Sequence, residues 1–138
     1  MRVEIDARQF ARDVQDLERL IDRAEPGITR ALRVGAVNIQ GDMVRAVQSS
    51  PPTGRMRPSG DRASSPGNAP RTDTGRLVSS FRVEPAMNGA DLVIPVGYAS
   101  ALEYGTRNMA PRPFVGPAIE RQTPRITQDV ADAVGRAR

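Results

Sequence analysis

The side chains able to do chemistry in this chain are carboxylates, hydroxyls and guanidinium groups. Its 138 residues include no Cys, His or Trp, and all 20 basic residues are Arg. Thiolate and imidazole metal sites, Cys or His nucleophiles, Schiff-base lysines and a P-loop lysine are therefore excluded. Without Cys there is also no disulfide framework that would indicate a redox compartment.

Carboxylate catalysis is the enzymatic chemistry that remains. A glycoside hydrolase needs two acids about 5–10 Å apart in a cleft. Outside the first predicted helix, however, the acids are scattered, and most lie beside an Arg or a turn: Glu84, Asp91, Glu103 and Glu120. No nucleophile elbow, EF-hand loop or phosphate-binding glycine motif is present. We expect no enzyme, metal or cofactor; a hydrolase that depends on Glu103 is the weakest hypothesis.

The positive charge is concentrated in the middle of the chain. The formal net charge is +4, and residues 1–48 and 83–138 each contain equal numbers of Arg and acids. Residues 49–82 therefore hold the whole excess, from Arg55, Arg57, Arg62, Arg71, Arg76 and Arg82 against Asp61 and Asp73. The planar guanidinium fork is suited to carboxylate or phosphate partners.

Residues 49–75, here called the arm, differ in composition from the rest of the chain. They contain five Pro, five Ser and four Gly, and Met56 is their one large apolar residue. Such a segment cannot bury enough surface to offset the entropy of ordering, so we expect it to be flexible and partly extended by itself. It is either a solvated loop or an arm that orders against a neighbouring subunit, another protein or nucleic acid. It has no aromatic residue on which a base could stack, which weakens the nucleic-acid alternative.

Two helices are predicted before the arm. Over 7–24 an apolar stripe recurs at helical spacing, with Asp6 as the N-cap: Phe10, Val14, Leu17, Ile21 and Ala24. Pro26 interrupts the pattern and is suited to begin a second helix that ends near residue 48. Its stripe comprises Ile28, Leu32, Ala36, Ile39, Met43 and Val47.

The second half of the chain predicts a small sheet and a closing helix. A helical turn near 73–77 is followed by strands at 81–84 and 92–98, with Asn88-Gly89 as the hairpin turn. A turn of helix at 99–104 and a proline-rich loop at 105–117 lead to a helix that runs from Pro117 to about Gly135. We expect one α+β domain over 1–138: two N-terminal helices, a hairpin-based antiparallel sheet and a C-terminal helix.

The most distinctive segments surround this last loop. They read Y-A-S-A-L-E-Y-G-T at 98–106 and A-P-R-P-F-V-G-P-A at 110–118. Tyr98 and Tyr104 each offer an apolar ring with a hydroxyl group. Glu103 could bind backbone N–H groups of the Gly105 turn or the Arg107 side chain, and Phe114 could fill the core or a pocket. As structural residues, these positions would simply stabilise a fold that has few aromatics.

Together with T-G-R-L-V-S-S at 74–80, these segments resemble, in the same order, the neck or tail-completion proteins of siphophages. These proteins form the small gene-product-ten-like family of lambda-related phages. The long arm, rich in Arg and Ser, departs from the family pattern. The positions that match the motifs are Thr74, Gly75, Leu77, Ser80, Tyr98, Ala99, Glu103, Tyr104, Gly105, Thr106, Pro111, Pro113, Phe114 and Pro117.

The resemblance implies a virion structural protein of the head–tail junction, found in the host cytoplasm during assembly. It would form a homo-oligomeric ring, expected to have six subunits, between the head-completion or connector proteins and the tail-terminator or tail-tube proteins. DNA would pass through without sequence-specific binding. A gene transfer agent or a prophage would give the same pattern. The residues expected to contact other subunits are Arg55, Arg57, Arg62, Arg71, Arg107, Arg112 and Phe114.

A second hypothesis is a nucleic-acid-binding module that uses the basic segment 49–82. Membrane association is not expected, because no apolar run approaches the roughly 18–20 residues of a membrane helix. The first ten residues, MRVEIDARQF, are charged and do not resemble a secretory signal, so we expect a cytosolic protein.

Overall fold

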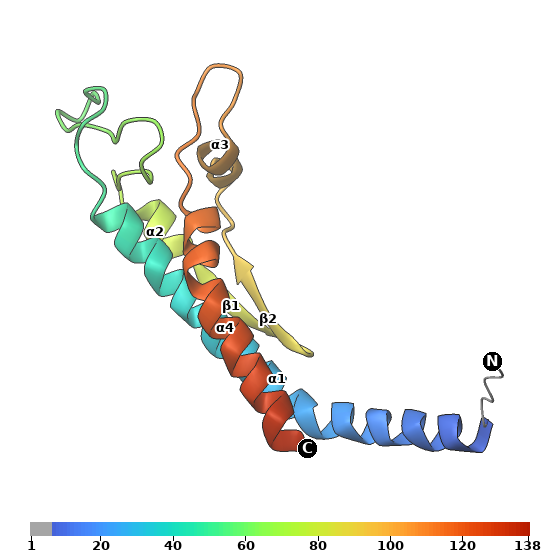
Figure 1. Ribbon diagram of the computed structural model, residues 1–138. Helices are drawn as coiled ribbons and strands as arrows, with labels where there is room; N and C mark the ends of the chain where they lie inside the picture. The colour runs from blue at the N-terminus through green and yellow to red at the C-terminus, as the bar shows by residue number, and fades with distance from the viewer. Residues whose placement is uncertain (1–6) are drawn as a thin grey trace.

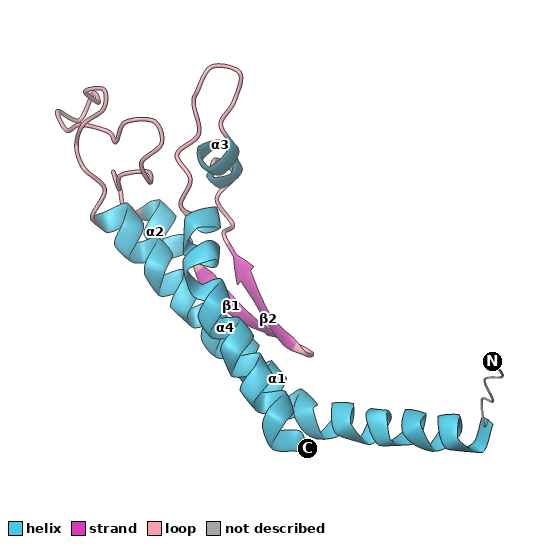
Figure 2. Cartoon of the chain, viewed as in Figure 1, coloured by secondary structure: helices cyan, strands magenta, loops and turns pink. Residues whose placement is uncertain are grey.

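The computed structural model describes residues 7–138, which form an α+β fold around one long helix. Helix α1 (Ala7–Gln48) is followed by the arm, α2 (Arg76–Ser80), β1 (Arg82–Ala86), β2 (Gly89–Val93), α3 (Ala99–Tyr104) and α4 (Val115–Ala137). The strands lie beside α1, and α4 runs along it (Figures 1 and 2). The predicted α+β class is confirmed. The proposed Asp6 cap and the Phe10 side chain lie outside what the structure describes.

The prediction of two N-terminal helices is wrong. Helix α1 is continuous over 42 residues, with Pro26 inside it. Proline removes one backbone hydrogen bond and crowds the preceding turn, which bends a helix without necessarily ending it. Figure 1 shows this outcome as a sharp change of direction in the blue part of α1. Beyond the bend α1 packs against α4, whereas before it the helix projects away from the other helices and strands that the structure describes.

Small residues bring α1 and α4 close together. A Cβ atom added to Gly27 would lie 2.9 Å from the Ala133 Cβ, and one added to Gly35 would lie 2.5 Å from Ile126 Cγ1. Because contacts move toward the start of α1 as they move toward the end of α4, the two helices are antiparallel. Pro117 lies in the first turn of α4, as predicted, and Pro124 is accommodated inside the helix.

The hairpin turn lies one residue earlier than the predicted Asn88-Gly89 pair. Strands β1 and β2 are antiparallel, with Arg82 opposite Val93 and Ala86 opposite Gly89, so Met87 and Asn88 form the turn. Strand β2 runs from Gly89 to Val93, so it begins before the predicted strand over 92–98, and that prediction is wrong beyond Val93, where Pro95 has no N–H to continue the ladder. The Arg33 guanidinium ties the hairpin to α1 by donating to Gly89 O (3.1 Å) and Ala86 O (3.0 Å).

The main core lies where the end of α1 meets α2, α3 and the start of α4. The Phe81 and Phe114 rings stack there, with centroids 5.8 Å apart. The buried members of this cluster are Met43, Val47, Leu77, Phe81, Ala99, Phe114 and Ala118. None of the helices described over 7–138 combines the length and apolar character needed to cross a membrane.

A buried carboxylate links α1 to α4 outside this core. Asp42 is 3% exposed, and its Oδ2 accepts a 2.6 Å hydrogen bond from Gln122 Nε2 on α4. Arg45 bonds its other oxygen, and Arg121 Nη1 lies 3.8 Å from Oδ2. The hydrogen bond from Gln122, followed by those charges, lowers the pKa of Asp42 despite its burial.

Candidate functional site

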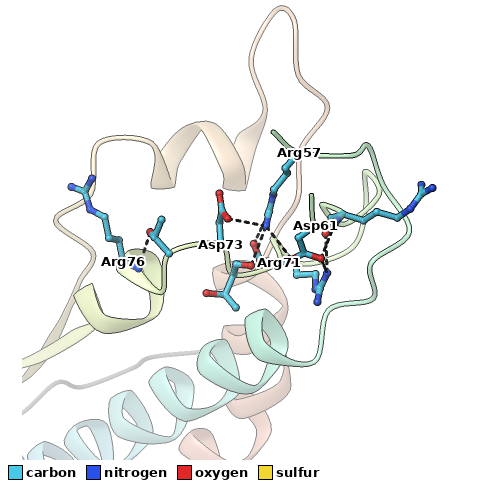
Figure 3. Close-up of polar contacts among 8 residues, drawn as sticks. Arg57, Asp61, Arg71, Asp73 and Arg76 are labelled. Carbon is cyan, nitrogen blue, oxygen red and sulfur yellow. Dashed lines mark hydrogen bonds and ion pairs between the residues drawn. The ribbon is translucent and has the colours of Figure 1, made fainter. Parts of the chain in front are cut away.

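Arg57 organises the arm from its interior. Its Nη1 donates to Thr72 O (3.1 Å) and its Nη2 to Arg71 O (2.8 Å). The guanidinium also lies 3.9 Å from Asp61 and 3.7 Å from Asp73 (Figure 3). Arg57 thus holds the first part of the arm against its last residues. Its side chain is only 18% exposed, so little of it is available to a partner.

Asp61 and Arg71 form a second set of contacts that holds the arm together. Arg71 Nη1 donates to Asp61 Oδ1 (2.6 Å) and to Arg62 O (2.9 Å). Asp61 also accepts a 2.8 Å hydrogen bond from the Arg62 backbone N–H. That backbone hydrogen bond, with the bond from Arg71 next, lowers the pKa of Asp61. The exposed carboxylate therefore stays ionised and holds the loop through several donors.

The arm folds back on itself, which differs from the partly extended chain that its composition predicts. Gly54 N donates to Ala63 O (2.7 Å), and a Cβ at Gly54 would lie 2.2 Å from Ser64 O. Only glycine allows this close approach of the two backbones. Ser64 is fully buried, and Gly67 N donates to Pro111 O (3.1 Å), which joins the arm to the loop before α4.

A pocket of about 320 Å³ lies between the arm, α2 and α3. Arg57, Arg71 and Arg112 line it together with Asp73 and Tyr98. The Arg112 Nε is buried and has no hydrogen-bond partner among residues 7–138. Arg57 and Arg71 are already engaged by Asp61, Asp73 and backbone carbonyls, so Arg76 and Arg112 are the guanidinium groups of this lining that could meet a carboxylate or phosphate group.

Arg76 also borders the pocket, although sequence reasoning did not include it among the contact residues. Its guanidinium points away from the Arg57–Asp61–Asp73 cluster in Figure 3, and the residue is exposed. Its place beside Gly75, at the start of a short helix, could have indicated an accessible position. Among the predicted contact residues, the exposed ones are Arg55, Arg62 and Arg107, the half-buried ones are Arg57, Arg71 and Arg112, and Phe114 is buried.

Phe114 belongs to the core. It is 1% exposed and stacks on Phe81, so it cannot serve as a contact with another subunit. From the sequence alone, a phenylalanine between prolines could equally well be buried in the core or exposed as a contact with a partner. The stacking partner decides between them, and it lies 33 positions earlier in the chain.

Glu103 caps α4. Its Oε2 accepts hydrogen bonds from Phe114 N (2.8 Å) and Val115 N (3.0 Å), and its Oε1 accepts one from Gly116 N (2.8 Å). The N–H groups are thus those that begin α4, not those of the Gly105 turn or the Arg107 side chain. A carboxylate engaged in this way satisfies donors that have no partner within the helix, and it complements the helix dipole.

Backbone geometry explains two of the glycines in the motifs. Gly75 and Gly105 both have φ of 77°, in the region that only glycine adopts readily. Of the motif positions, Leu77, Ala99 and Phe114 are buried, and Gly75, Ser80, Glu103, Gly105 and Pro113 are half-buried. The exposed motif positions are Thr74, Tyr98, Tyr104, Thr106, Pro111 and Pro117.

Asp42 is a polar centre that sequence reasoning did not single out. It lies seven positions after Gly35, so it falls on the side of α1 that faces α4. An acid among the small and apolar residues that face α4 was the feature of the sequence that could have indicated this polar contact. Over the part of the chain that the structure describes, no group of three or more acids could hold a metal ion.

Comparison with known proteins gives no assignment: no family model matches the chain, and neither a curated protein nor a solved structure matches it significantly.

Proposed function

We propose that this chain is a structural subunit of a phage head–tail junction, which assembles into a ring between the head connector and the tail. The motifs at 74–80, 98–106 and 110–118 motivate the proposal through their resemblance to neck proteins. Their residues serve the fold, since Glu103 caps α4 and Phe114 fills the core. This use of the motifs is consistent with a protein whose function is to present surfaces.

The observation that carries the proposal is the exposure of large apolar side chains along an elongated subunit. Leu17, Ile21 and Val37 are each more than half exposed, and Met87 and Tyr104 are 92% and 81% exposed. Leu17 and Ile21 lie one turn apart on α1, and an apolar stripe on a helix that no neighbouring element covers is rare in a water-soluble monomer. Surfaces of this kind are typical of a subunit that other chains cover.

Imaging and mass measurement test this proposal. Negative-stain microscopy and native mass spectrometry would be applied to the purified chain, alone and with the proteins encoded next to it. We expect a ring of defined copy number, at least when the neighbouring neck proteins are present. A chain that stays monomeric and joins no such assembly would contradict the proposal.

Nucleic-acid binding is the second candidate, favoured by the exposed arginines Arg55, Arg62, Arg76 and Arg82. Arg57 and Arg71 hold the arm together, so replacing them would confuse loss of binding with loss of structure. The sharper test replaces Arg55, Arg76 and Arg82 with Ala and measures duplex binding across a salt series. Binding through phosphates predicts a steep salt dependence that these substitutions reduce. Undetectable binding of the wild-type chain at low salt would refute this candidate.

A further inference from the structure

An apolar stripe on the projecting part of α1 has no packing partner among the residues that the structure describes. Val14, Leu17 and Ile21 are 37%, 56% and 55% exposed, and their spacing places them on one face. The stripe continues the seam that α4 covers beyond the bend, where Ala24 and Ala31 are buried. The contact with α4 ends near the bend (Figure 1), whereas Val14, Leu17 and Ile21 come before it in the chain.

The projecting segment also lacks the contacts that normally stabilise a helix. All of residues 11–19 are exposed, so little tertiary packing supports this part of α1. Most helices in proteins depend on packing of an amphipathic face, because isolated short helices are marginal in water. A partner that covers the stripe would supply this missing packing.

Charges beside the stripe favour one kind of partner. Asp13 and Glu18 flank it on its two sides, whereas Arg12, Arg19 and Arg23 lie on the opposite face of the helix. Two copies of the stripe facing each other would place acids against acids, which disfavours that pairing. The complementary surface is apolar and has an arginine at its edge.

The same chain offers such a surface beyond the bend. Val34 and Val37 are 45% and 55% exposed, and their spacing from the exposed Arg30 puts all three on one face of α1. This face is turned away from α4, which packs on Gly35, and Arg33 beside it reaches to the hairpin. An open groove of about 420 Å³ lies beside this face at the bend, lined by Glu25, Pro26, Thr29, Arg30, Arg33 and Val34.

We propose that the stripe of Val14, Leu17 and Ile21 in one copy packs on the Val34–Val37 face of the next copy. Arg30 of the receiving copy lies opposite one of the two acids that flank the stripe. This inference rests on the proposed ring and names the surfaces that join its subunits. Because the two surfaces differ, the contact is head-to-tail, and it gives a closed ring when the rotation between copies closes.

Engineered disulfides test this contact directly, because the chain has no cysteine of its own. The double variant Leu17→Cys/Val37→Cys would be oxidised mildly, alone and with the neighbouring neck proteins, and run on a non-reducing gel. The two positions are 20 residues apart on α1, about 20 Å or more, so they cannot bridge within one chain. We expect a ladder of covalent dimers, trimers and larger species that ends at the size of the ring.

Leu17→Cys/Met87→Cys is the matched control. Met87 is 92% exposed at the tip of the hairpin, outside the proposed contact. We expect this pair to give no ladder. An equal ladder from the control, a product that stops at the dimer, or no cross-link in either preparation would overturn the proposed contact.

Leu17→Glu separates this inference from the proposed function. The substitution adds an acid to an exposed face, so circular dichroism should show an unchanged fold while ring formation is lost. Met87→Glu should leave both unchanged. If wild-type protein forms rings and Leu17→Glu forms them equally well, the contact is wrong and the ring stands. If the wild-type chain forms no ring with its neck partners, the proposed function itself is wrong.

Discussion

Glu103 accepts hydrogen bonds from three consecutive backbone N–H groups at the start of α4. As a sequence feature, the same glutamate is the leading candidate for carboxylate chemistry. Its geometry gives it a different role, because both oxygens face donors that a helix cannot satisfy by itself. At the scale of single residues, several polar side chains of this protein have structural roles of this kind.

Replacing Glu103 with Gln tests the cap. The amide keeps one acceptor, loses the charge that favours a helix N-terminus, and turns its NH₂ toward a donor. We expect the free energy of unfolding to fall by about 1–2 kcal/mol, measured by urea denaturation. Glu120→Gln, on the exposed side of α4, is the control and should change little. Equal stabilities of the two variants would contradict the capping role.

Asp42 gives the protein an acid-sensitive link between α1 and α4. Because its pKa is lowered in the folded state, its contribution is present above the unfolded value of about 4 and is lost as the pH falls through the folded value. We expect Asp42→Asn to lower the free energy of unfolding by about 2 kcal/mol at neutral pH.

The difference between Asp42→Asn and wild type should shrink as the pH falls below about 4, when the wild-type carboxylate becomes protonated. Denaturation curves of both proteins at neutral and acid pH provide the measurement. A difference that is independent of pH would mean that the charge of Asp42 does not stabilise the α1–α4 contact.

At the scale of elements, proline sets the bend of α1 and glycine sets how closely α4 packs on it. Pro26 bends the helix without ending it, and the small residues beyond the bend let α4 approach closely. A pattern of apolar residues shows which face of a helix is suited to burial, but not whether a neighbouring helix covers that face or how near it comes. Replacing a glycine of α1 with alanine should therefore have different effects on stability at different positions.

Gly27→Ala and Gly41→Ala form a matched pair on α1. Alanine favours a helix by about 1 kcal/mol over glycine, so both changes would stabilise an isolated helix. At Gly41 the new Cβ meets Arg45 at 3.5 Å, an ordinary contact, and we expect higher stability. At Gly27 it lies 2.9 Å from the Ala133 Cβ, and overpacking of about 1–3 kcal/mol should reverse the gain. Thermal unfolding of both variants measures this; a rise for Gly27→Ala would contradict the tight seam.

The arm is an element without regular secondary structure, held by Arg57. Arg57→Lys keeps the charge but loses the fork that bonds Thr72 O and Arg71 O. We expect faster amide hydrogen exchange at Gly54 and Ala63, whose N–H groups donate within the arm. Arg55→Lys, at an exposed position, should leave these rates unchanged. Identical exchange in both variants would mean that the arm is held by other contacts.

At the scale of the whole molecule, the surfaces left uncovered lie far apart. The arm and the loop before α4 occupy one end, and the projecting part of α1 extends from the other (Figure 1). A molecule of this shape would bury its apolar groups more completely in an assembly than alone. The proposed head-to-tail contact uses this asymmetry, since each copy would offer one surface and accept another.

The sequence by itself determined the α+β class, the helical faces, the hairpin and the location of the charge excess. These features follow from local periodicity and composition, which each segment carries with it. Tertiary structure alone decided that Pro26 bends one helix, that Arg57 closes the arm, that Glu103 caps α4 and that Phe114 stacks on Phe81. Each of these outcomes depends on a group distant in the chain or on whether a neighbouring element covers the surface, and no local pattern specifies such a distance.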